Sequence, residues 1–372
     1  MDFKKYIIGK SKEIGIDVIG FADCNKLNSL KGYLIERREN NKETEFEERD
    51  IEKRIDPKKV FPSCKTIITI GVSYNVEFND KVEYKFKGKI SKSSWGEDYH
   101  RVIKEKMGKL INEIKKEKDF KYEYFVDTGP LIDRELAKKS GIGWYGKNCS
   151  IINNFYGSFI FIGYILTDLD TEPDIEVEEG CNDCNLCIKA CPTGALEEPY
   201  RLNPKKCISY LTQTKNEIPY ELREKMGIKI YGCDTCQLIC PINKRAVKSD
   251  KNEFIPKITK GYIDIEELFT LSNRQFKEKY GHMAGSWRGR NILRRNSLIA
   301  LGNMKEKKNI YFLKDLLNDE NPMIRKYATW SILNIDINIG SSIIKEAIKV
   351  EKNEDVKKEM ESLLKYFQNK NC

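Results

Sequence analysis

Eight of the 12 cysteines in this 372-residue chain lie between residues 181 and 240. The first four follow the spacing Cys181-x2-Cys184-x2-Cys187-x3-Cys191 and are followed by Pro192. In this pattern three closely spaced thiolates bind one [4Fe–4S] cluster, and the fourth, placed before proline, binds a second cluster. The segment therefore predicts a domain built around two clusters, in a compartment that keeps thiols reduced.

The second half of this segment supplies one ligand fewer than a symmetrical two-cluster domain needs. It contains Cys233-x2-Cys236-x3-Cys240-Pro241, and the isolated Cys207 can supply the missing thiolate. We assign cluster one to Cys181, Cys184, Cys187 and Cys240, and cluster two to Cys191, Cys207, Cys233 and Cys236. Structural zinc on four of these cysteines is the alternative, but zinc sites do not use a three-cysteine run that ends in Cys-Pro. The other cysteines have no patterned partners and are expected to be ordinary thiols: Cys24, Cys64, Cys149 and Cys372.

The first 170 residues have the pattern of a mixed α/β domain. Residues 65–76 and 159–166 form apolar, β-rich runs that predict buried strands, and residues 120–126 and 17–21 are weaker candidates. Between these strands, Ile103, Met107, Leu110, Ile111 and Ile114 fall on one face of a helix. Residues 168–179 hold seven acidic residues and one proline, which is typical of a linker.

The last 100 residues are expected to be helical and to contain a repeat. Residues 292–304 align with residues 323–335 at a period of 31, and a fainter third copy starts near Asp355. Helix pairs at this period resemble a short HEAT-type array, in which each repeat buries its face on the next. Three ordinary helices with accidental similarity are the alternative.

Nearly all of the net charge of +9 comes from residues 273–312, which hold ten basic and two acidic residues. Tyr280 and Trp287 lie among these cations, and such a mixture favours contact with phosphates and unpaired bases of a nucleic acid. A solvated helical face is the alternative. A membrane protein is not expected, because the longest apolar stretch, at about residues 155–166, is too short to span a bilayer. Residues 1–15 read as an amphipathic helix and not as a signal peptide.

Residues 126–150 are the candidate active-site segment. Asp127 follows a predicted strand, where a carboxyl group can face a cofactor and act as an acid, although such aspartates often only close a turn or cap a helix. The motif Gly141-x-Gly143-x-x-Gly146 does not follow a strand, so it is interpreted as a loop that lets backbone approach a flat ligand. Asp98-x-His100 is a poor match to a cobalt-binding histidine motif, because Ile103 replaces its closing glycine.

Taken together, these segments resemble the epoxyqueuosine reductases, cobalamin-dependent enzymes of queuosine biosynthesis. The resemblance rests on residues 50–57, 93–100, 126–144, 180–196, 207–215, 231–244 and 272–289, and on the helical repeat. It implies reduction of epoxyqueuosine at the tRNA wobble position to queuosine, with electrons passing through two [4Fe–4S] clusters to cobalamin. It also implies an α+β multidomain fold with an α/β, nitroreductase-related cobalamin-binding domain (1–170), a ferredoxin-like iron–sulfur domain (171–260) and a basic, HEAT-like, tRNA-binding helical domain (261–372).

The resemblance also implies functional residues. Asp127 is the expected proton donor, and its pKa should be raised by burial against the corrin. The implied cobalamin contacts are Arg54, Asp127, Asn148, Ile151, Ile162, Ser209, Thr212 and Asp234. The implied tRNA contacts are Ser272, Asn273, Trp287, Arg288 and Arg290. No protein histidine need bind the cobalt.

Two other functions were weighed against this oxidoreductase. A cobalamin-dependent, reductive dehalogenase-like reductase of a small molecule would use the same core but leaves the basic segment and the repeat unexplained. A non-catalytic RNA-binding protein with structural clusters leaves the N-terminal domain unused. We expect a cytoplasmic monomer that acts on the anticodon stem-loop of tRNA, receives electrons from an unidentified donor and has no membrane partner.

Overall fold

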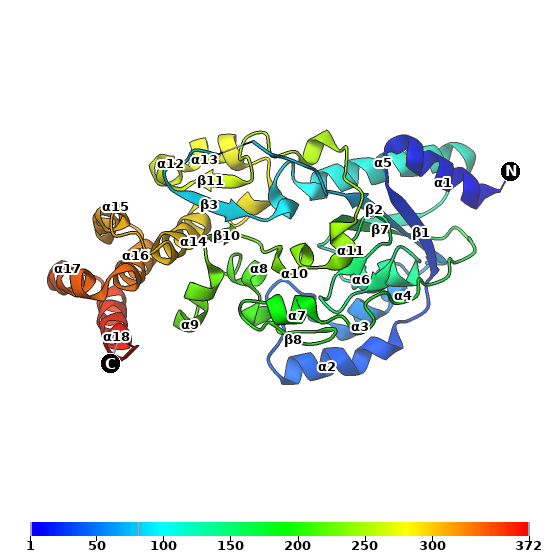
Figure 1. Cartoon of the computed structure of the whole chain (residues 1–372). Coiled ribbons are helices and arrows are strands. Elements are labelled where there is room, and N and C mark those ends of the chain that lie inside the picture. The colour runs from blue at the N-terminus through cyan, green and yellow to red at the C-terminus, as the bar shows by residue number, and fades with distance from the viewer. Residues whose placement is uncertain (1, 81, 371–372) are drawn as a thin grey trace. The chain divides into compact units, whose positions relative to one another are not determined.

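The computed structural model describes residues 2–80 and 82–370 and shows a mixed α/β architecture with two compact units (Figure 1). Neither unit is continuous in sequence. The first contains residues 1–78, 96–207 and 234–255, and the second contains residues 79–95, 208–233 and 256–372. The sequence predicts three consecutive domains, whereas the units found from contacts are two and discontinuous. The three-domain division stays a prediction. Cys372 lies outside the described residues.

The first unit is built on a four-stranded antiparallel sheet in the order β1-β2-β7-β4. Its strands are β1 (Val18–Asp23), β2 (Thr66–Ser73), β7 (Ile160–Thr167) and β4 (Tyr122–Phe125), which confirms the four predicted strands to within a few residues. Every residue of β2 is buried, and only one residue of β7 is partly exposed. Both faces of the central strands must therefore be covered by other elements.

Helices α5 (Tyr99–Glu117) and α6 (Asp133–Lys139) cover opposite faces of this sheet. On the α5 face, Gly163 lies against Met107 and Ile103, so the predicted apolar helix face is confirmed as the packing face. On the α6 face, the hydroxyl groups of Thr69 and Ser140 are hydrogen-bonded at 2.8 Å. Helix α5 starts at the N-cap Asp98, whose side chain accepts the backbone N–H of His100.

The shorter elements of the first unit surround the sheet. Helix α1 (Phe3–Ile14) packs on α5, and β5 (Trp144–Tyr145) pairs with β6 (Ile151–Ile152). Cys24 and Cys64 are buried and joined by a disulfide, so the expectation that both are ordinary thiols is wrong. This bond joins the two ends of the segment that contains η1 (Asn28–Leu30), α2 (Lys31–Glu39), α3 (Ile51–Ile55) and α4 (Pro57–Val60).

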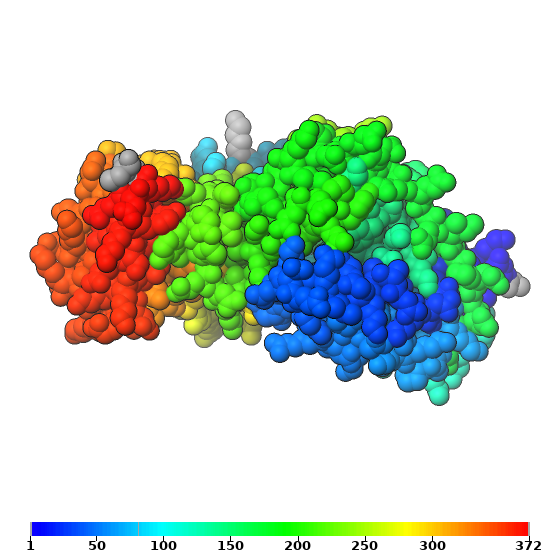
Figure 2. All heavy atoms as spheres, turned by 90° about the horizontal axis from the view of Figure 1, so that it is seen from below, coloured from blue at the N-terminus to red at the C-terminus, as the bar shows by residue number. Residues whose placement is uncertain are grey.

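The cysteine-rich part of the first unit follows residues 168–180, which form no helix or strand and lie within that unit as a loop. It contains α7 (Leu186–Ala190), β8 (Leu196–Glu198), β9 (Arg201–Leu202), η3 (Pro204–Lys206), α10 (Thr235–Leu238), α11 (Pro241–Lys244) and η5 (Asn252–Phe254). Ion pairs of Glu36 with Arg201 and of Lys42 with Glu197 tie this part to the α2 segment. Figure 2 shows the two as blue and green surfaces side by side.

The second unit combines a small sheet with a series of packed helices. Strand β3 (Lys87–Ile90) lies between β10 (Lys229–Tyr231) and β11 (Tyr262–Asp264), parallel to the first and antiparallel to the second. Around it lie η2 (Lys92–Ser94), α8 (Ile208–Leu211), α9 (Tyr220–Arg223), η4 (Glu224–Met226), α12 (Ile265–Thr270), α13 (Asn273–Tyr280) and η6 (Ala284–Ser286).

The aligned repeat segments are helices in the structure. Helix α14 (Arg290–Asn303) packs on α16 (Pro322–Ile335), and α16 packs on α18 (Glu354–Lys370). Helices α15 (Asn309–Asp315) and α17 (Ile337–Val350) and η7 (Leu316–Asn318) connect them. Trp330 is completely buried in the apolar core that these helices share. The helical prediction is confirmed, whereas the assignment to the HEAT type stays a prediction. None of the helices described is long and apolar enough to cross a membrane.

Candidate active site and iron–sulfur ligands

Asp127 lies in a tightly constrained loop between β4 and α6. Its backbone adopts a left-handed conformation with a φ of 58°, which aspartate and asparagine tolerate better than most residues. Two residues later the loop passes directly over β7, where a Cβ atom on Gly129 would lie 2.0 Å from the hydroxyl oxygen of Tyr164. Only glycine fits at this crossing. The loop conformation thus fixes where the Asp127 carboxylate lies.

Two side chains from the start of α5 meet the Asp127 carboxylate. The Tyr99 hydroxyl donates a hydrogen bond of 2.8 Å to Oδ2, and His100 Nε2 lies 3.6 Å from the same oxygen. The other ring nitrogen of His100, Nδ1, lies 2.7 Å from Oδ1 of Asp98. The Tyr99 ring stacks on Phe161 of β7 at 4.3 Å, which holds its hydroxyl in place. Asp98-x-His100 therefore orients an imidazole toward Asp127, a role that the sequence pattern did not reveal.

The electrostatics of this group differ from the expectation for Asp127. Partial desolvation by the surrounding protein raises the pKa of the Asp127 carboxyl group, although its side chain is 64% exposed, but hydrogen bonds from His100 and Tyr99 more than offset this effect and leave the pKa below its usual value. Burial lowers the pKa of His100, whereas Asp127 and Asp98 raise it to about 9. The protein's own groups thus hold Asp127 as a carboxylate beside a protonated imidazole. The expected rise of the Asp127 pKa is therefore not produced by the protein residues around it.

A second carboxyl group missed by the sequence reasoning lies next to Asp127. Burial and the nearby charge of Asp127 raise the pKa of Asp133, the first residue of α6, to about 7. Near neutral pH both the protonated and the ionised form of the Asp133 carboxyl group are therefore populated. The sequence offered no signal for this role beyond an acidic residue in the first turn of a helix.

The predicted cobalamin contacts in the first unit include two buried amide or guanidinium donors. Arg54 is 8% exposed and is ion-paired, with its Nη1 2.9 Å from Oε2 of Glu47. Asn148 is also buried, and within the described residues its Nδ2 has no hydrogen-bond partner. A buried donor without a partner is costly, so the Asn148 amide fits an acceptor-rich ligand such as the corrin side chains.

The remaining predicted cobalamin contacts are apolar or belong to other segments. Ile151 of β6 and Ile162 of β7 pack in one apolar cluster, and Asp234 is buried just before α10. Ser209 and Thr212 lie in the second unit, where the Thr212 hydroxyl accepts the backbone N–H of Gly232 at 2.9 Å.

The glycine motif at 141–146 packs against the protein itself. A Cβ atom on Gly143 would lie 2.3 Å from the Ile152 carbonyl oxygen, and one on Gly146 would lie 2.4 Å from the Ile152 side chain. Gly143 and Gly146 allow β5 and β6 to pair closely. This packing explains the glycines without the predicted approach of the backbone to a flat ligand.

The cysteines of cluster one come together from distant parts of the sequence. Burial raises the pKa of Cys187, and the nearby thiolates of Cys181 and Cys240 raise it further. Helices α7 and α10, which contain or adjoin these residues, pack on each other. In the described residues no three His, Cys, Asp or Glu side chains lie close enough to hold a single metal ion.

Cys191, assigned to cluster two, is prepared to act as a thiolate. Burial raises its pKa, but the backbone N–H groups of Leu196, Ala195 and Thr193 and the Thr193 hydroxyl lower it below the usual value overall. The Thr193 oxygen lies 3.7 Å from the Cys191 sulfur. Such donors stabilise an anionic sulfur and are typical of cluster ligands. Burial raises the pKa of Cys149, by contrast, and Cys149 stays a free thiol.

The predicted tRNA contacts lie around α13 and the start of α14. Trp287 is 53% exposed, its Nε1 donates to Gln213 Oε1 at 3.1 Å, and the Arg288 guanidinium lies 4.0 Å from its ring centre. Arg290 donates to the carbonyl oxygen of Leu271. Ser272 caps α13 through a capping box with Gln275, and Asn273 is exposed as the first residue of that helix. Trp287 and Arg288 thus present a flat, cationic surface.

Part of the basic segment has a structural role instead. Arg295 is completely buried and donates to the carbonyl oxygens of Leu211 and Thr214 at 2.8 and 2.7 Å. Arg294 is buried and paired with Asp319. The prediction that the basic residues of the segment 273–312 favour contact with phosphates therefore does not hold for these two arginines.

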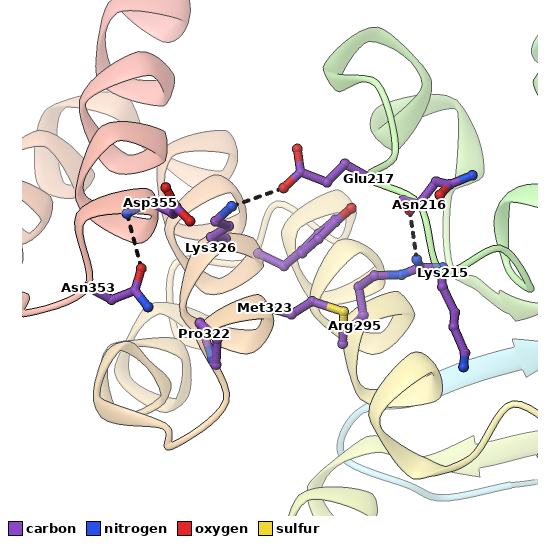
Figure 3. Close-up of a pocket in the computed structure, with 10 residues that line it drawn as sticks. Lys215, Asn216, Glu217, Arg295, Pro322, Met323, Lys326, Asn353 and Asp355 are labelled. Carbon is purple, nitrogen blue, oxygen red and sulfur yellow. Dashed lines mark hydrogen bonds and ion pairs between the residues drawn. The ribbon is translucent and has the colours of Figure 1, made fainter.

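A cavity of about 270 Å³ lies in the second unit, and none of the residues that line it is a predicted site residue (Figure 3). An ion pair of 3.0 Å between Lys326 and Glu217 crosses it, and the Arg295 guanidinium is occupied by backbone carbonyls. The lining residues are Lys215, Asn216, Glu217, Arg295, Pro322, Met323, Lys326, Tyr327, Asn353 and Asp355. Three of the charged lining residues, Glu217, Lys326 and Arg295, therefore already have partners within the protein.

Comparisons with known proteins place these features in context. Residues 54–128 match the family model described as epoxyqueuosine reductase QueG, DUF1730, and residues 180–243 match a 4Fe-4S double cluster binding domain. The second match confirms the iron–sulfur prediction. An epoxyqueuosine reductase from Bacillus cereus is 42% identical over 97% of both chains, and one from Escherichia coli K12 is 33% identical over 86% of both chains.

Solved structures agree with the sequence comparisons. A crystal structure of epoxyqueuosine reductase with an epoxyqueuosine-modified tRNA-Tyr stem loop is 38% identical, with a TM-score of 0.93 over 98% of both chains. The Streptococcus thermophilus enzyme gives a TM-score of 0.90 over 99% of this chain and 100% of that one. A Bacillus subtilis structure, with a TM-score of 0.91, has its catalytic loop swung out of the active site.

Proposed function

The chain belongs to the epoxyqueuosine reductase family, and we propose that it reduces epoxyqueuosine at the wobble position of tRNA to queuosine, the last step of queuosine biosynthesis. The near full-length likeness to an enzyme solved with its modified stem loop carries this proposal. Removing the epoxide oxygen as water consumes two electrons and two protons for each alkene formed. The site must therefore supply both.

The residues present fit the cofactors that this reaction needs. The eight assigned cysteines supply enough thiolates for two [4Fe–4S] clusters. Arg54 and Asn148 would donate hydrogen bonds to cobalamin, Ile151 and Ile162 would form an apolar contact with it, and Asp234, Ser209 and Thr212 would complete the set. When bound, cobalamin supplies a strongly reducing cobalt ion for opening the epoxide.

The protonation of the leaving oxygen falls to Asp127 and its neighbours. Its Oδ2 accepts the Tyr99 hydroxyl, and His100 stands protonated beside the same oxygen. A proton on His100 can pass to Asp127 as the oxygen leaves, so Asp127 need not be stored as the neutral acid. Asp98 keeps the imidazole oriented while its charge changes.

We expect the pH dependence of turnover to report His100. Because its pKa is raised to about 9, its proton and its pairing with Asp98 and Asp127 are lost as pH rises through about 9, and turnover should fall there. The stabilisation of the fold by this pairing is present in full below pH 6.5, the usual pKa, and is lost over the same rise. His100→Gln should lower turnover by about 10²-fold and abolish this basic limb.

Measuring the turnover number of both proteins on either side of pH 9, with saturating RNA, tests this prediction. His282, the only other histidine, provides the matched control as His282→Gln, which should leave the limb unchanged. A basic limb that persists in His100→Gln contradicts the proposed role of His100.

The second unit is proposed to hold the anticodon stem-loop through Ser272, Asn273, Trp287, Arg288 and Arg290. A modified base cannot react within a stack, so its nucleotide must be flipped out. The exposed Trp287 ring with Arg288 over it can stack on an unpaired base, and Arg290 can contact a phosphate. A HEAT-type array of α14, α16 and α18 would extend this surface.

Trp287→Ala should weaken binding of the stem-loop by about 1–3 kcal/mol, because it removes a base-stacking platform. The salt dependence of binding should change little. Arg290→Ala should instead reduce the slope of affinity against salt by about one phosphate contact. Fluorescence anisotropy over a salt series separates the two effects, and Tyr311→Ala, an exposed aromatic residue on α15, serves as control. Equal affinity of Trp287→Ala and the unaltered protein contradicts the stacking role.

Three further properties are part of the proposal: the division into cobalamin-binding, ferredoxin-like and tRNA-binding domains, a monomeric state, and a cytoplasmic location. The decisive test of function is anaerobic turnover of epoxyqueuosine-containing RNA. The protein is reconstituted with iron, sulfide and cobalamin and reduced chemically, and nucleosides are analysed by mass spectrometry. Conversion to queuosine that requires cobalamin supports the proposal, and an unchanged epoxide rejects it.

A further inference from the structure

An exposed, basic and partly apolar surface lies beside the cluster cysteines of the first unit. Residues 235–248 contain Cys236 and Cys240, three basic residues and no acidic residue. Leu238, Val247 and Phe155 are among the most exposed large apolar side chains of this unit, at 48%, 52% and 68%. We call the surface formed by the exposed residues Phe155, Leu238, Lys244, Arg245 and Val247 the α10–α11 surface.

The contacts beneath this surface hold it together as one unit. Asn243 donates from Nδ2 to the Gln237 carbonyl oxygen at 2.7 Å and to the Ser158 hydroxyl at 2.8 Å. The backbone N–H of Val247 donates to the Phe155 carbonyl oxygen at 2.8 Å. The loop at 155–158 is therefore fixed against the α10–α11 segment. These hydrogen bonds hold the backbone of Phe155, the exposed apolar residue of this loop, in place.

The charges on this surface are available to a partner. Within the described residues, neither Lys244 nor Arg245 takes part in an ion pair, and Lys248 pairs with Glu77. Most cations elsewhere in the first unit, including Lys139 and Lys251, are paired within the chain. Two unpaired cations around apolar side chains favour a protein partner with a negative surface and an apolar centre.

We propose that the α10–α11 surface docks a small, acidic, one-electron carrier protein. The proposal rests on the proposed function, since it identifies the class of partner that feeds the two clusters. In each encounter the reduced centre of the carrier loses one electron, and one [4Fe–4S]²⁺ cluster becomes [4Fe–4S]⁺. No bond is broken and no proton moves, and two encounters supply the two electrons that one epoxide requires.

An RNA phosphate backbone is the other partner that a basic surface can bind. Leu238, Val247 and Phe155 favour the protein carrier, because apolar side chains contribute little to phosphate contacts. Proximity to Cys236 and Cys240 also favours the carrier, because electrons must enter near the clusters. The test must nevertheless measure RNA binding alongside carrier binding.

The test uses the reconstituted holoenzyme and a plant-type ferredoxin as the acidic carrier. The double variant Lys244→Glu, Arg245→Glu should slow cluster reduction by reduced ferredoxin at least about 10-fold, and should weaken binding of redox-inert, gallium-substituted ferredoxin similarly. Reduction by dithionite, which needs no docking surface, and stem-loop affinity should not change. Lys58→Glu, Lys59→Glu, an exposed basic pair on α4, is the matched control.

Unchanged ferredoxin binding and reduction in the Lys244, Arg245 double variant overturns the proposal. A selective loss of stem-loop affinity also overturns it and assigns the surface to RNA. If reduction by dithionite also slows in the double variant, the substitutions have damaged the clusters. Phe155→Ser then tests the docking surface instead, because the loop that carries Phe155 holds no cluster ligand. That variant should weaken ferredoxin binding alone. Dithionite-driven turnover of epoxyqueuosine RNA tests the proposed function separately, since it bypasses the carrier.

Discussion

Asp127→Asn is expected to retain both clusters and cobalamin but to lose turnover by about 10²- to 10⁴-fold, the usual contribution of a positioned general acid. The substitution is close to isosteric. Asparagine tolerates the left-handed backbone at this position, and its side-chain oxygen can still accept the Tyr99 hydroxyl. What the amide cannot do is receive a proton from His100 and release it to the leaving oxygen. The loss should therefore appear in the rate of product formation and not in binding.

Three measurements distinguish this outcome from a structural defect. Iron content and the cobalamin spectrum should match those of the unaltered protein, and stem-loop affinity should be equal. Tyr99→Phe is the matched control, because it removes one hydrogen bond to Asp127 and leaves the proton path from His100 intact. It should cost far less turnover. Full activity of Asp127→Asn would remove Asp127 from the mechanism.

The main strands and helices could be predicted because their patterns are long and strongly apolar. Strands β2 and β7 are eight-residue runs rich in isoleucine, and α5 presents its apolar residues at helical spacing from Val102 to Ile114. Strands β3, β10 and β11 have only three or four residues, so no alternation can be read from them. They become strands only by pairing with one another across long stretches of chain, so no local sequence pattern reveals them.

The chemistry of the site was only partly predictable for a related reason. Asp127 could be chosen from its place after a strand, but its partners come from the start of α5, 27 and 28 residues earlier. Only the packing of α5 on the sheet brings Tyr99 and His100 to the Asp127 loop. Burial was taken as the dominant influence on the Asp127 pKa, whereas the hydrogen bonds from these two residues outweigh it.

Counting charge along the sequence also had a limit. Arg294 and Arg295 contribute to the basic total, yet their guanidinium groups are directed into the second unit. Helix α14 is buried over most of its length, so a basic residue there must find partners inside the protein. Cys24 and Cys64 show the same limit, since their pairing depends on the ends of β1 and β2 lying side by side.

Cys207→Ala is expected to remove one cluster and reduce turnover to background. Cys207 is the assigned cluster ligand that lies outside the two cysteine runs, placed between η3 and α8. A [4Fe–4S] cluster needs four thiolates, so its loss should lower iron from about eight to about four atoms per chain. Without one cluster the electron path to the reacting centre is broken, and chemical reductant should not restore turnover as it does in the unaltered protein.

Cys149→Ala is the matched control for this experiment. Like Cys207 it stands alone in the sequence, but it is buried, its pKa is raised by burial, and no cluster assignment uses it. Iron content, the electron paramagnetic resonance signal of the reduced protein and turnover should all be retained in this variant. If Cys207→Ala also keeps about eight iron atoms and its turnover, the fourth ligand of cluster two must be another residue. An equal loss of iron in both variants would instead show that the loss is not specific to Cys207, and would contradict its assignment as a cluster ligand.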